Sequence, residues 1–351
     1  MKHWLRVTVS LVAALACRGQ VLYPYFEDGR RSGFIDARGN VVIKASFDTV
    51  TPFSEGYAAV RIGELWSFID SNGSVVAKDV PAAAWPNGFQ EGLTGTCVKR
   101  PASDGRLIWG FVDRTGAVAI KHEFDWVSNF SEGLAVVERA GRFHFIDHRG
   151  ENPFGTVYRR AGQFSEGFAM VETEVGVGYL DRSGKMAVNP VFQGATAFSE
   201  GLAGVQLRGG RWGFVDGRGM PRIAHDFDEI RPFSEGLAGV RIGDRWGFID
   251  GRGRLAIECR FKSVKSFSRG LAVAREDKSY GYIGRNGAYR IKPGYQEANS
   301  FTRGGLALVR LGASGASASI NKGGASAYIN ERGASAYINE GGAVVWSATI
   351  R

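Results

Sequence analysis

The stretch WGFIDGRG at residues 246–253 decides the fold, because near copies of it recur along the chain. The aspartate of this motif falls at positions 36, 70, 113, 147, 181, 216 and 250, in steps of 34, 43, 34, 34, 35 and 34 residues. A fixed period of this kind is the signature of tandem repeats. The one longer step contains PASDG at 101–105, a turn-rich insertion that lengthens one loop without disturbing the period.

A second signature, FSEGLA or a near relative, alternates with the first. It starts at Phe53, Phe89, Phe130, Phe164, Phe198, Phe233, Phe267 and Phe301. Each unit reads as a small antiparallel meander, with strands predicted in one copy at 237–241, 246–250 and 255–257. Residues 261–267 then lead into the next unit, either as a short fourth strand or as an irregular segment. A meander of this size is not stable alone and must stack on its neighbours.

The composition agrees with an all-β repeat protein. Glycine accounts for 50 of the 351 residues, about twice its usual share, which indicates many tight turns. Hydrophobic residues make up 44% and charged residues 23%, which excludes wholesale disorder. The formal net charge of +9 comes from basic residues scattered singly, so we expect a solvated surface and no nucleic-acid partner.

The N-terminus is typical of an export signal. Lys2 and Arg6 precede an apolar run at 7–16, which is too short to span a bilayer and ends in Ala-Leu-Ala. We therefore expect a signal peptide at 1–16 and an exported protein that is periplasmic, secreted or envelope-anchored. Cys17 follows at once, so plain export and a lipoprotein acylated at Cys17, which would give a lipid anchor in the membrane, both stay open.

The remaining chain divides into a regular and an irregular part. Tandem repeats, about eight units, are predicted for 17–310. Residues 311–351 are predicted to form a degenerate final repeat, in which 315–321 recurs with a nine-residue step. Local duplication is the simple explanation of these copies, and a functional tract is the alternative.

The two signatures together resemble the WG-repeat family of bacterial proteins, and the resemblance covers nearly all of the chain from Tyr23 to Trp346. It implies an all-β tandem-repeat protein, often exported, with no catalytic site assigned to the repeat. Three departures concern the last units: Gly284 stands where the motif has aspartate, and Arg269 and Arg303 stand where it has glutamate.

The glutamates of the Ser-Glu-Gly segment are the strongest candidates for an interaction face. They are Glu55, Glu91, Glu132, Glu166, Glu200 and Glu235. Equivalent positions in stacked units would place these carboxylates in a file that binds cations or a basic partner. The face is predicted to consist of Glu132, Glu166, Glu200 and Glu235. The alternative is that each carboxylate only satisfies local backbone amides.

Other candidate groups favour structural roles. An aspartate at the start of a turn, with glycine three residues later, is what turn chemistry demands. The motif tryptophans are expected to pack between units, with a ligand-binding ladder as the alternative. His122 and His225 occupy matching positions without a metal-ligand pattern, and Cys97 and Cys259 are expected to be small buried residues. We predict no catalytic residue, no metal and no cofactor.

The sequence thus predicts an all-β chain of tandem β-meander repeats of about 34 residues, forming a β-propeller-like or an open solenoid-like array. Whole units at both ends leave no spare strand to close a ring, so the two arrays stay open as alternatives. The predicted function is an exported, non-enzymatic binding or scaffold module for a protein or a cell-envelope polymer. A polysaccharide-acting enzyme that uses carboxylates of the glutamate file is the alternative.

Overall fold

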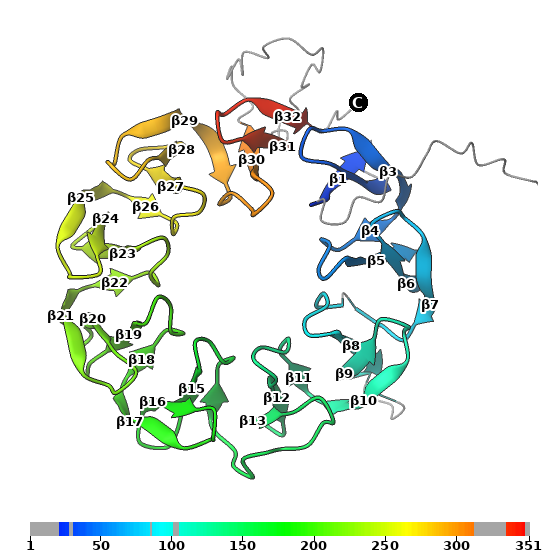
Figure 1. Cartoon of the computed structure of the whole chain (residues 1–351), viewed down its shortest axis with the longest axis horizontal. Helices are drawn as coiled ribbons and strands as arrows, with labels where there is room; N and C mark the ends of the chain where they lie inside the picture. The colour runs from blue at the N-terminus through cyan, green and yellow to red at the C-terminus, as the bar shows by residue number, and fades with distance from the viewer. Residues whose placement is uncertain (1–20, 28–30, 85, 101–104, 312–334, 348–351) are drawn as a thin grey trace, which may run out of the picture.

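The protein is all-β, and its repeat units follow one another around a ring (Figure 1). The computed structural model describes residues 21–27, 31–84, 86–100, 105–311 and 335–347. Within these ranges the strands form eight antiparallel sheets, and the last sheet joins two units through its long strand β29 (Tyr289–Ala298). Nine units result. The predicted fold class is confirmed, and the array is the propeller-like alternative.

A complete unit is a four-stranded meander. Unit 7 consists of β22 (Glu229–Ile230), β23 (Leu237–Ile242), β24 (Arg245–Asp250) and β25 (Leu255–Phe261), paired in that order. The short first strand is the segment that the sequence left open between strand and irregular structure. One residue separates β25 from β26 (Ser263–Val264), so the chain passes almost directly from one unit into the next.

The other units repeat this order, some with one strand fewer. Units 1 to 3 comprise β1 (Tyr23–Glu27), β2 (Arg31–Ile35) and β3 (Val41–Phe47); β4 (Thr49–Val50), β5 (Tyr57–Ile62), β6 (Leu65–Asp70) and β7 (Val75–Val80); and β8 (Leu93–Lys99), β9 (Leu107–Asp113) and β10 (Val118–Phe124). Units 4 to 6 comprise β11 (Trp126–Val127), β12 (Ala135–Arg139) and β13 (Arg142–Ile146); β14 (Arg160–Ala161), β15 (Phe168–Glu172), β16 (Val177–Asp181) and β17 (Met186–Phe192); and β18 (Gly194–Ala195), β19 (Ala203–Gln206), β20 (Trp212–Val215) and β21 (Pro221–Phe227).

Units 8 and 9 share the strand β29. Unit 8 comprises β26, β27 (Ala272–Arg275), β28 (Tyr280–Ile283) and the start of β29. Unit 9 comprises the end of β29 with β30 (Leu306–Leu311), β31 (Ser335–Asn339) and β32 (Val344–Ser347). The final unit therefore takes strands from before residue 311, and only the last of the three nine-residue copies lies within the described residues, as its third strand.

The hydrophobic core lies between units, not inside any one of them. The third strand β24 is buried along its length because both faces of each sheet are covered by neighbours. Trp246 and Phe248 point to unit 8, where they join a cluster with Phe267 and Ile283. Ile249 points the other way and packs with residues of unit 6. Successive side chains of one strand therefore point to opposite faces of the sheet and pack in two different interfaces.

An aromatic pair marks every interface between consecutive units. The third-strand aromatic of one unit contacts the phenylalanine of the FSEG motif in the next, with ring centroids 4.6–5.2 Å apart. The pairs are Phe34–Phe53, Phe68–Phe89, Phe111–Phe130, Phe145–Phe164, Tyr179–Phe198, Phe214–Phe233, Phe248–Phe267 and Tyr282–Phe301. Their tilted or edge-to-face geometry is the arrangement that aromatic quadrupoles favour.

The glycine of the WG motif is explained by a bulge in the fourth strand. Between the pairs Trp246↔Phe261 and Phe248↔Ile257, two residues of β24 advance while β25 advances four. The bulged strand presses onto β24, and a β-carbon at Gly247 would lie 2.4 Å from the carbonyl oxygen of Ile257. The five other units with this glycine show the same bulge.

The three units without the glycine lack this four-residue bulge. Ser67 of unit 2 faces a shorter one, since β7 advances only three residues between its pairs with Trp66 and Phe68. Unit 4 has His144 and no fourth strand among the described residues, and Ala336 of unit 9 pairs with Ser347 in regular register. The glycine therefore depends on local strand geometry, not on a ligand.

The first and last units close the ring through side chains (Figure 1). Unit 1 begins within the described residues at its second strand, so it supplies no motif phenylalanine to the interface with unit 9. Tyr23 takes that role: its ring lies 5.4 Å from Tyr337, the third-strand aromatic of unit 9, and its hydroxyl lies 3.0 Å from Thr302 Oγ1. Tyr25 packs beside it against Trp346, 5.8 Å away.

These tyrosines stand where the other units have small residues. Tyr23 pairs with Ile35 as Ala238 pairs with Ile249, so the two occupy the same place in their units. The extra volume of a tyrosine there fills the space that a motif phenylalanine fills elsewhere. The described residues at the two ends add no spare strand, and the ring is closed by side chains of units 1 and 9.

We predict that Tyr23→Ala opens the ring. The substitution removes a buried ring from the one interface that no backbone segment bridges, and it should cost about 3 kcal/mol or more. Small-angle scattering should show a larger radius of gyration, and the melting temperature should fall. Phe233→Ala is the matched control, because it damages an interface that the chain crosses: it should lower the melting temperature and leave the shape unchanged. An unchanged profile for Tyr23→Ala would contradict closure by this residue.

Candidate functional site

The FSEG segment forms a tight two-residue turn between the first and second strands. In unit 7, Ser234 and Leu237 bridge the turn, while Glu235 and Gly236 have φ of 54° and 77°. Two successive positive φ values are typical of a type I′ turn, where asparagine and glycine are favoured. A glutamate there costs about 1–2 kcal/mol of backbone strain. The same conformation recurs at Glu55, Glu91, Glu132, Glu166, Glu200 and Arg269.

The carboxylates of these glutamates explain why the strain is retained. Glu166 accepts hydrogen bonds from the backbone amides of Glu200 and Gly201 in the next unit, at 2.7 and 2.8 Å. The further links run from Glu55 to the amides of Glu91 and Gly92, from Glu91 to Gly133, from Glu132 to Gly167, from Glu200 to Gly236, and from Glu235 to those of Arg269 and Gly270. The left-handed turn directs each carboxylate onto the next turn, so the motif ties seven consecutive units together.

The motif serine adds a second ladder beside the first. Its hydroxyl donates to the backbone carbonyl of the motif phenylalanine in the following unit, as Ser165 does to Phe198 at 2.8 Å. Ser131, Ser199, Ser234 and Ser268 make the same bond to Phe164, Phe233, Phe267 and Phe301. In Figure 1 the connection between β29 and β30 lies at the inner edge of the ring, and the repeat places the equivalent turns there too. We call this set of turns the inner rim.

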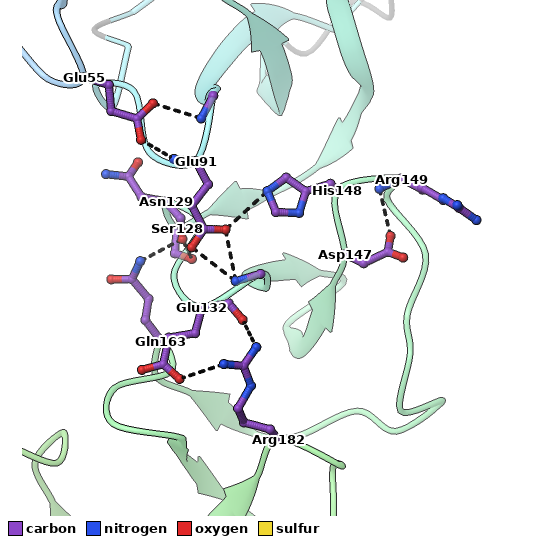
Figure 2. A network of polar contacts seen from close by, with 12 residues as sticks. Glu55, Glu91, Ser128, Asn129, Glu132, Asp147, His148, Arg149, Gln163 and Arg182 are labelled. Atoms are coloured by element: carbon purple, nitrogen blue, oxygen red, sulfur yellow. Dashed lines mark hydrogen bonds and ion pairs between the residues drawn. The ribbon is translucent and has the colours of Figure 1, made fainter.

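Basic side chains lie against three glutamates of the file, and Figure 2 shows two of them, His148 beside Glu91 and Arg182 beside Glu132. The residue after the turn aspartate reaches back to the glutamate of the preceding unit: Arg114 to Glu55 at 2.9 Å, His148 to Glu91 at 3.3 Å and Arg182 to Glu132 at 3.6 Å. These three glutamate side chains are 26–34% exposed.

Glu166 and Glu200 differ from Glu55, Glu91 and Glu132 in lacking such a partner, whereas Arg285 of unit 8 donates to the backbone carbonyl of Glu235. The equivalent positions in units 6 and 7 hold Gly217 and Gly251, which carry no side chain, and no ion pair to either glutamate is found within the described residues. Negative charge on the inner rim is therefore least compensated at these two carboxylates.

At the end of the file the charges exchange places. Arg269 replaces the glutamate of unit 8, and Glu340 of unit 9 stands where units 3 to 5 have arginine or histidine. The two side chains form an ion pair, and Arg269 also donates to the carbonyl of Arg303 at 3.1 Å. The interface between units 8 and 9 therefore also has an ion pair, but here the earlier unit supplies the arginine and the later unit supplies the glutamate.

Hydrogen bonds stabilise the ionised forms of Glu55 and of the turn aspartate Asp113. Burial opposes ionisation of Glu55, but the bonds from Arg114 and from the amides of Gly92 and Glu91 outweigh it and lower the pKa of its carboxyl. The pKa of Asp113 is lowered by the hydroxyl of Thr115 in the first place. A lowered pKa in the folded state adds stability above the unfolded pKa, and this contribution is lost as the pH falls through the folded value.

The structure places the predicted face residues Glu132, Glu166, Glu200 and Glu235 at equivalent turns of consecutive units. Their carboxylates do bind backbone amides, as the structural alternative required, but the amides belong to the next unit and are not local. The use of these residues as an interaction face stays a prediction. The steady spacing of Ser-Glu-Gly was the sequence signal for the ladder. The spacing does not show in which direction each glutamate side chain points.

We predict that Glu166→Gln combined with Glu200→Gln lowers stability. A glutamine side chain offers one acceptor oxygen and a donor where two backbone N–H groups approach, so the pair should lose about 1–3 kcal/mol. Thermal unfolding measures the loss. Glu229→Gln is the control, because this carboxylate is exposed and lies outside the turns. Equal melting temperatures for the double variant and the control would contradict the structural role of the ladder.

The remaining candidates have structural surroundings. The turn aspartates accept backbone amides two and four residues on, as Asp250 does from Arg252 and Arg254 at 2.9 and 3.0 Å, which confirms their predicted turn role. Trp66 and Trp246 are buried in inter-unit clusters, in accord with packing. Burial lowers the pKa of both His122 and His225. The described residues hold no group of histidine, cysteine and acidic side chains suited to a metal ion.

The predicted N-terminal features and the cysteines remain to be placed. The signal peptide at 1–16 and Cys17 lie outside the described residues. Cys97 is buried and Cys259 half-buried, and both are free thiols. No helix in the described part of the chain is long and apolar enough to cross a membrane.

Two surface pockets were not anticipated from the sequence. One, of about 490 Å³, lies between units 5 and 6 and is lined by ion-paired groups such as Arg159, Glu172 and Glu174. The other, of about 370 Å³, lies where units 3, 4 and 5 meet and contains Asn87, Trp126 and Gln163. Their lining residues differ between copies of the repeat, so the repeating sequence pattern does not indicate these pockets.

The profile of the WG-containing repeat family matches residues 33–66, 109–143, 178–210, 212–246, 246–279 and 280–313. These segments cover 204 of the 351 residues. No curated protein matches the sequence.

Among solved structures, the chain is similar to a eukaryotic initiation factor, with a TM-score of 0.62 and 11% identity over 93% of this chain and 95% of the other. It is also similar to BamB from Moraxella catarrhalis, with a TM-score of 0.44 and 13% identity over 75% of this chain and 90% of the other. A third similarity is to PorZ of the type-IX secretion system of Porphyromonas gingivalis, with a TM-score of 0.32 and 10% identity over 83% of this chain and 43% of the other. At such identities the first similarity concerns the fold alone.

Proposed function

Because the chain belongs to the WG-containing repeat family, we propose that it is a non-enzymatic binding or scaffold module that works at the cell envelope. Its ligand is a protein or an envelope polymer. The observation that carries the proposal is the inner rim, where the glutamate and serine ladders hold equivalent turns of successive units in fixed positions. A rigid, repeated surface favours binding because little conformational freedom is lost when a partner docks.

The charge on the rim favours a partner with basic groups. The protein has a formal net charge of +9, yet Glu166 and Glu200 form an acidic spot without basic side chains opposite. Glu132 and Glu235 flank this spot in the units before and after. Opposite potentials steer association and favour partners of matching charge.

The alternative function, a polysaccharide-acting enzyme, requires two carboxylates set apart from the rest and facing a substrate. The rim supplies one glutamate in each of units 2 to 7, and each is bonded to amides of its neighbour. Glu166 and Glu200, the pair without a basic partner, both accept backbone amides of the next unit, so no observation favours this alternative.

Export is the second part of the proposal and rests on the N-terminal sequence. We expect the protein purified from its native host to lack residues 1–16, and intact-mass measurement checks this. An added diacylglycerol mass on Cys17 would identify the lipoprotein form, and its absence would identify plain export. A mass that retains Met1 would contradict export by this signal.

Binding is tested by capture from envelope extract with the tagged chain of residues 17–351. We expect an envelope component to be retained and then released as salt rises, because exposed charges are screened beyond about 8 Å at physiological ionic strength. Glu166→Gln combined with Glu200→Gln should retain less, while Glu229→Gln should match the unmodified chain. Capture of nothing would contradict the binding function. If capture is unaffected by salt and by the double substitution, binding stands but the rim is not the binding face.

A further inference from the structure

The pocket where units 3, 4 and 5 meet has the chemistry of a ligand site. It measures about 370 Å³, and its lining includes Asn87, Trp126, Asn129, Gly162 and Gln163. None of its lining residues is charged. The volume falls in the range of small-molecule sites, about 300–1,000 Å³. We call it the amide pocket.

Comparison of the units shows that the amide pocket departs from the repeat. Four residues before the motif phenylalanine, where unit 4 has Trp126, unit 3 also has a tryptophan, Trp85, and six other units have Thr49, Arg160, Gly194, Glu229, Ser263 and Glu297. The two residues before the motif phenylalanine include an amide side chain in three units in succession, at Asn87, Asn129 and Gln163, and elsewhere only at Asn299. Packing needs common to all units cannot account for a cluster confined to three of them.

A missing side chain opens the pocket in unit 5. At the place of Gly162, unit 4 has Ser128 and unit 6 has Thr196, whose hydroxyls accept the amides of Val136 and Gly204. Gly162 has no side chain to make that bond, which is also missing at the equivalent Asn87, Arg231, Lys265 and Asn299, and the glycine forms part of the lining beside Gln163.

The amide groups are held in place through their nitrogen atoms. Gln163 Nε2 donates to the carbonyl of Asn129 at 2.7 Å, and Asn87 Nδ2 donates more weakly to that of Val127 at 3.4 Å (Figure 2 shows the first of these). Within the described residues no hydrogen bond reaches the side-chain oxygens of Asn87 and Gln163, and both residues are exposed. Each group therefore presents a fixed acceptor and a second N–H donor.

Trp126 supplies an apolar surface beside these groups. Its side chain is 42% exposed, while one edge packs against Phe143 with ring centroids 6.3 Å apart. A half-exposed indole that is held by a neighbour loses little freedom when a ligand covers it.

We propose that the amide pocket binds a neutral saccharide. Side-chain amides pair with hydroxyl groups, which are also both donors and acceptors, and an indole covers the apolar C–H face of a sugar ring. The uncharged lining favours a sugar without carboxylate or phosphate, since no group here would compensate such a charge. The inference rests on the proposed binding function and names the ligand class, a neutral glycan, for a site beside the inner rim.

The test titrates the full mature chain with chitobiose, cellobiose, maltose and mannobiose, followed by tryptophan fluorescence and calorimetry. We expect saturable binding of at least one disaccharide below about 10 mM. Trp126→Thr and Gln163→Ala should each weaken it by about tenfold or more. Both variants use residues that the repeat already carries at these places, Thr49 and Ala197, so the melting temperature should stay close to that of the unmodified protein.

Ser266→Ala is the matched control, because Ser266 occupies in unit 8 the place of Gln163, and it should leave the affinity unchanged. The proposal is wrong if no disaccharide saturates, or if the two pocket variants bind as tightly as the control. Capture of an envelope peptide that depends on Trp126, without saccharide binding, would also overturn it, but would leave the proposed binding function standing. Failure of both saccharide binding and envelope capture would overturn the two proposals together.

Discussion

The contact between one aromatic ring of a third strand and one phenylalanine of the following unit holds this structure together. A meander of four short strands has no interior of its own, so each sheet buries its two faces only against its neighbours. The repeated pair, exemplified by Phe248 and Phe267, fixes both the spacing and the angle between successive sheets. Because such a pair recurs at each step, the array curves around a ring, and the ninth unit lies beside the first (Figure 1). The Tyr23–Tyr337 contact supplies the same kind of pair at the junction.

Much of the fold could be predicted from the sequence because local chemistry repeats with the period. The turn aspartates, the alternation in WGFID and the punctuating glycines each report on contacts within a few residues, and these contacts formed as expected. Closure could not be predicted, because Tyr23 and Thr302 are 279 residues apart and their contact depends on an angle summed over all units. The tyrosines at 23 and 25, where other copies have small residues, were the available sign of an atypical interface.

The candidate site shows the same division between local and non-local information. The spacing of Ser-Glu-Gly predicted a file of glutamates, but only the positive φ of the turn determines that each carboxylate reaches the next unit. The exchange of charge between Arg269 and Glu340 was visible in the sequence only to a reader who already knew that these positions face each other. The amide pocket was harder still, since it consists of departures from the repeat that become meaningful when units 3, 4 and 5 are seen to adjoin.

Among the described residues, units 1 and 9 meet through side chains, and this has a consequence for assembly. Units 1 and 9 meet through complementary surfaces of one chain. The residues in contact are Tyr23, Tyr25, Tyr337 and Trp346. Complementary ends of this type can pair head to tail between molecules and grow into open filaments. Here the curvature holds the two ends beside each other, so the effective concentration of one for the other exceeds that of any second molecule. The geometry of the ring therefore protects the protein against its own polymerisation, and that protection is lost in molecules whose ring is open.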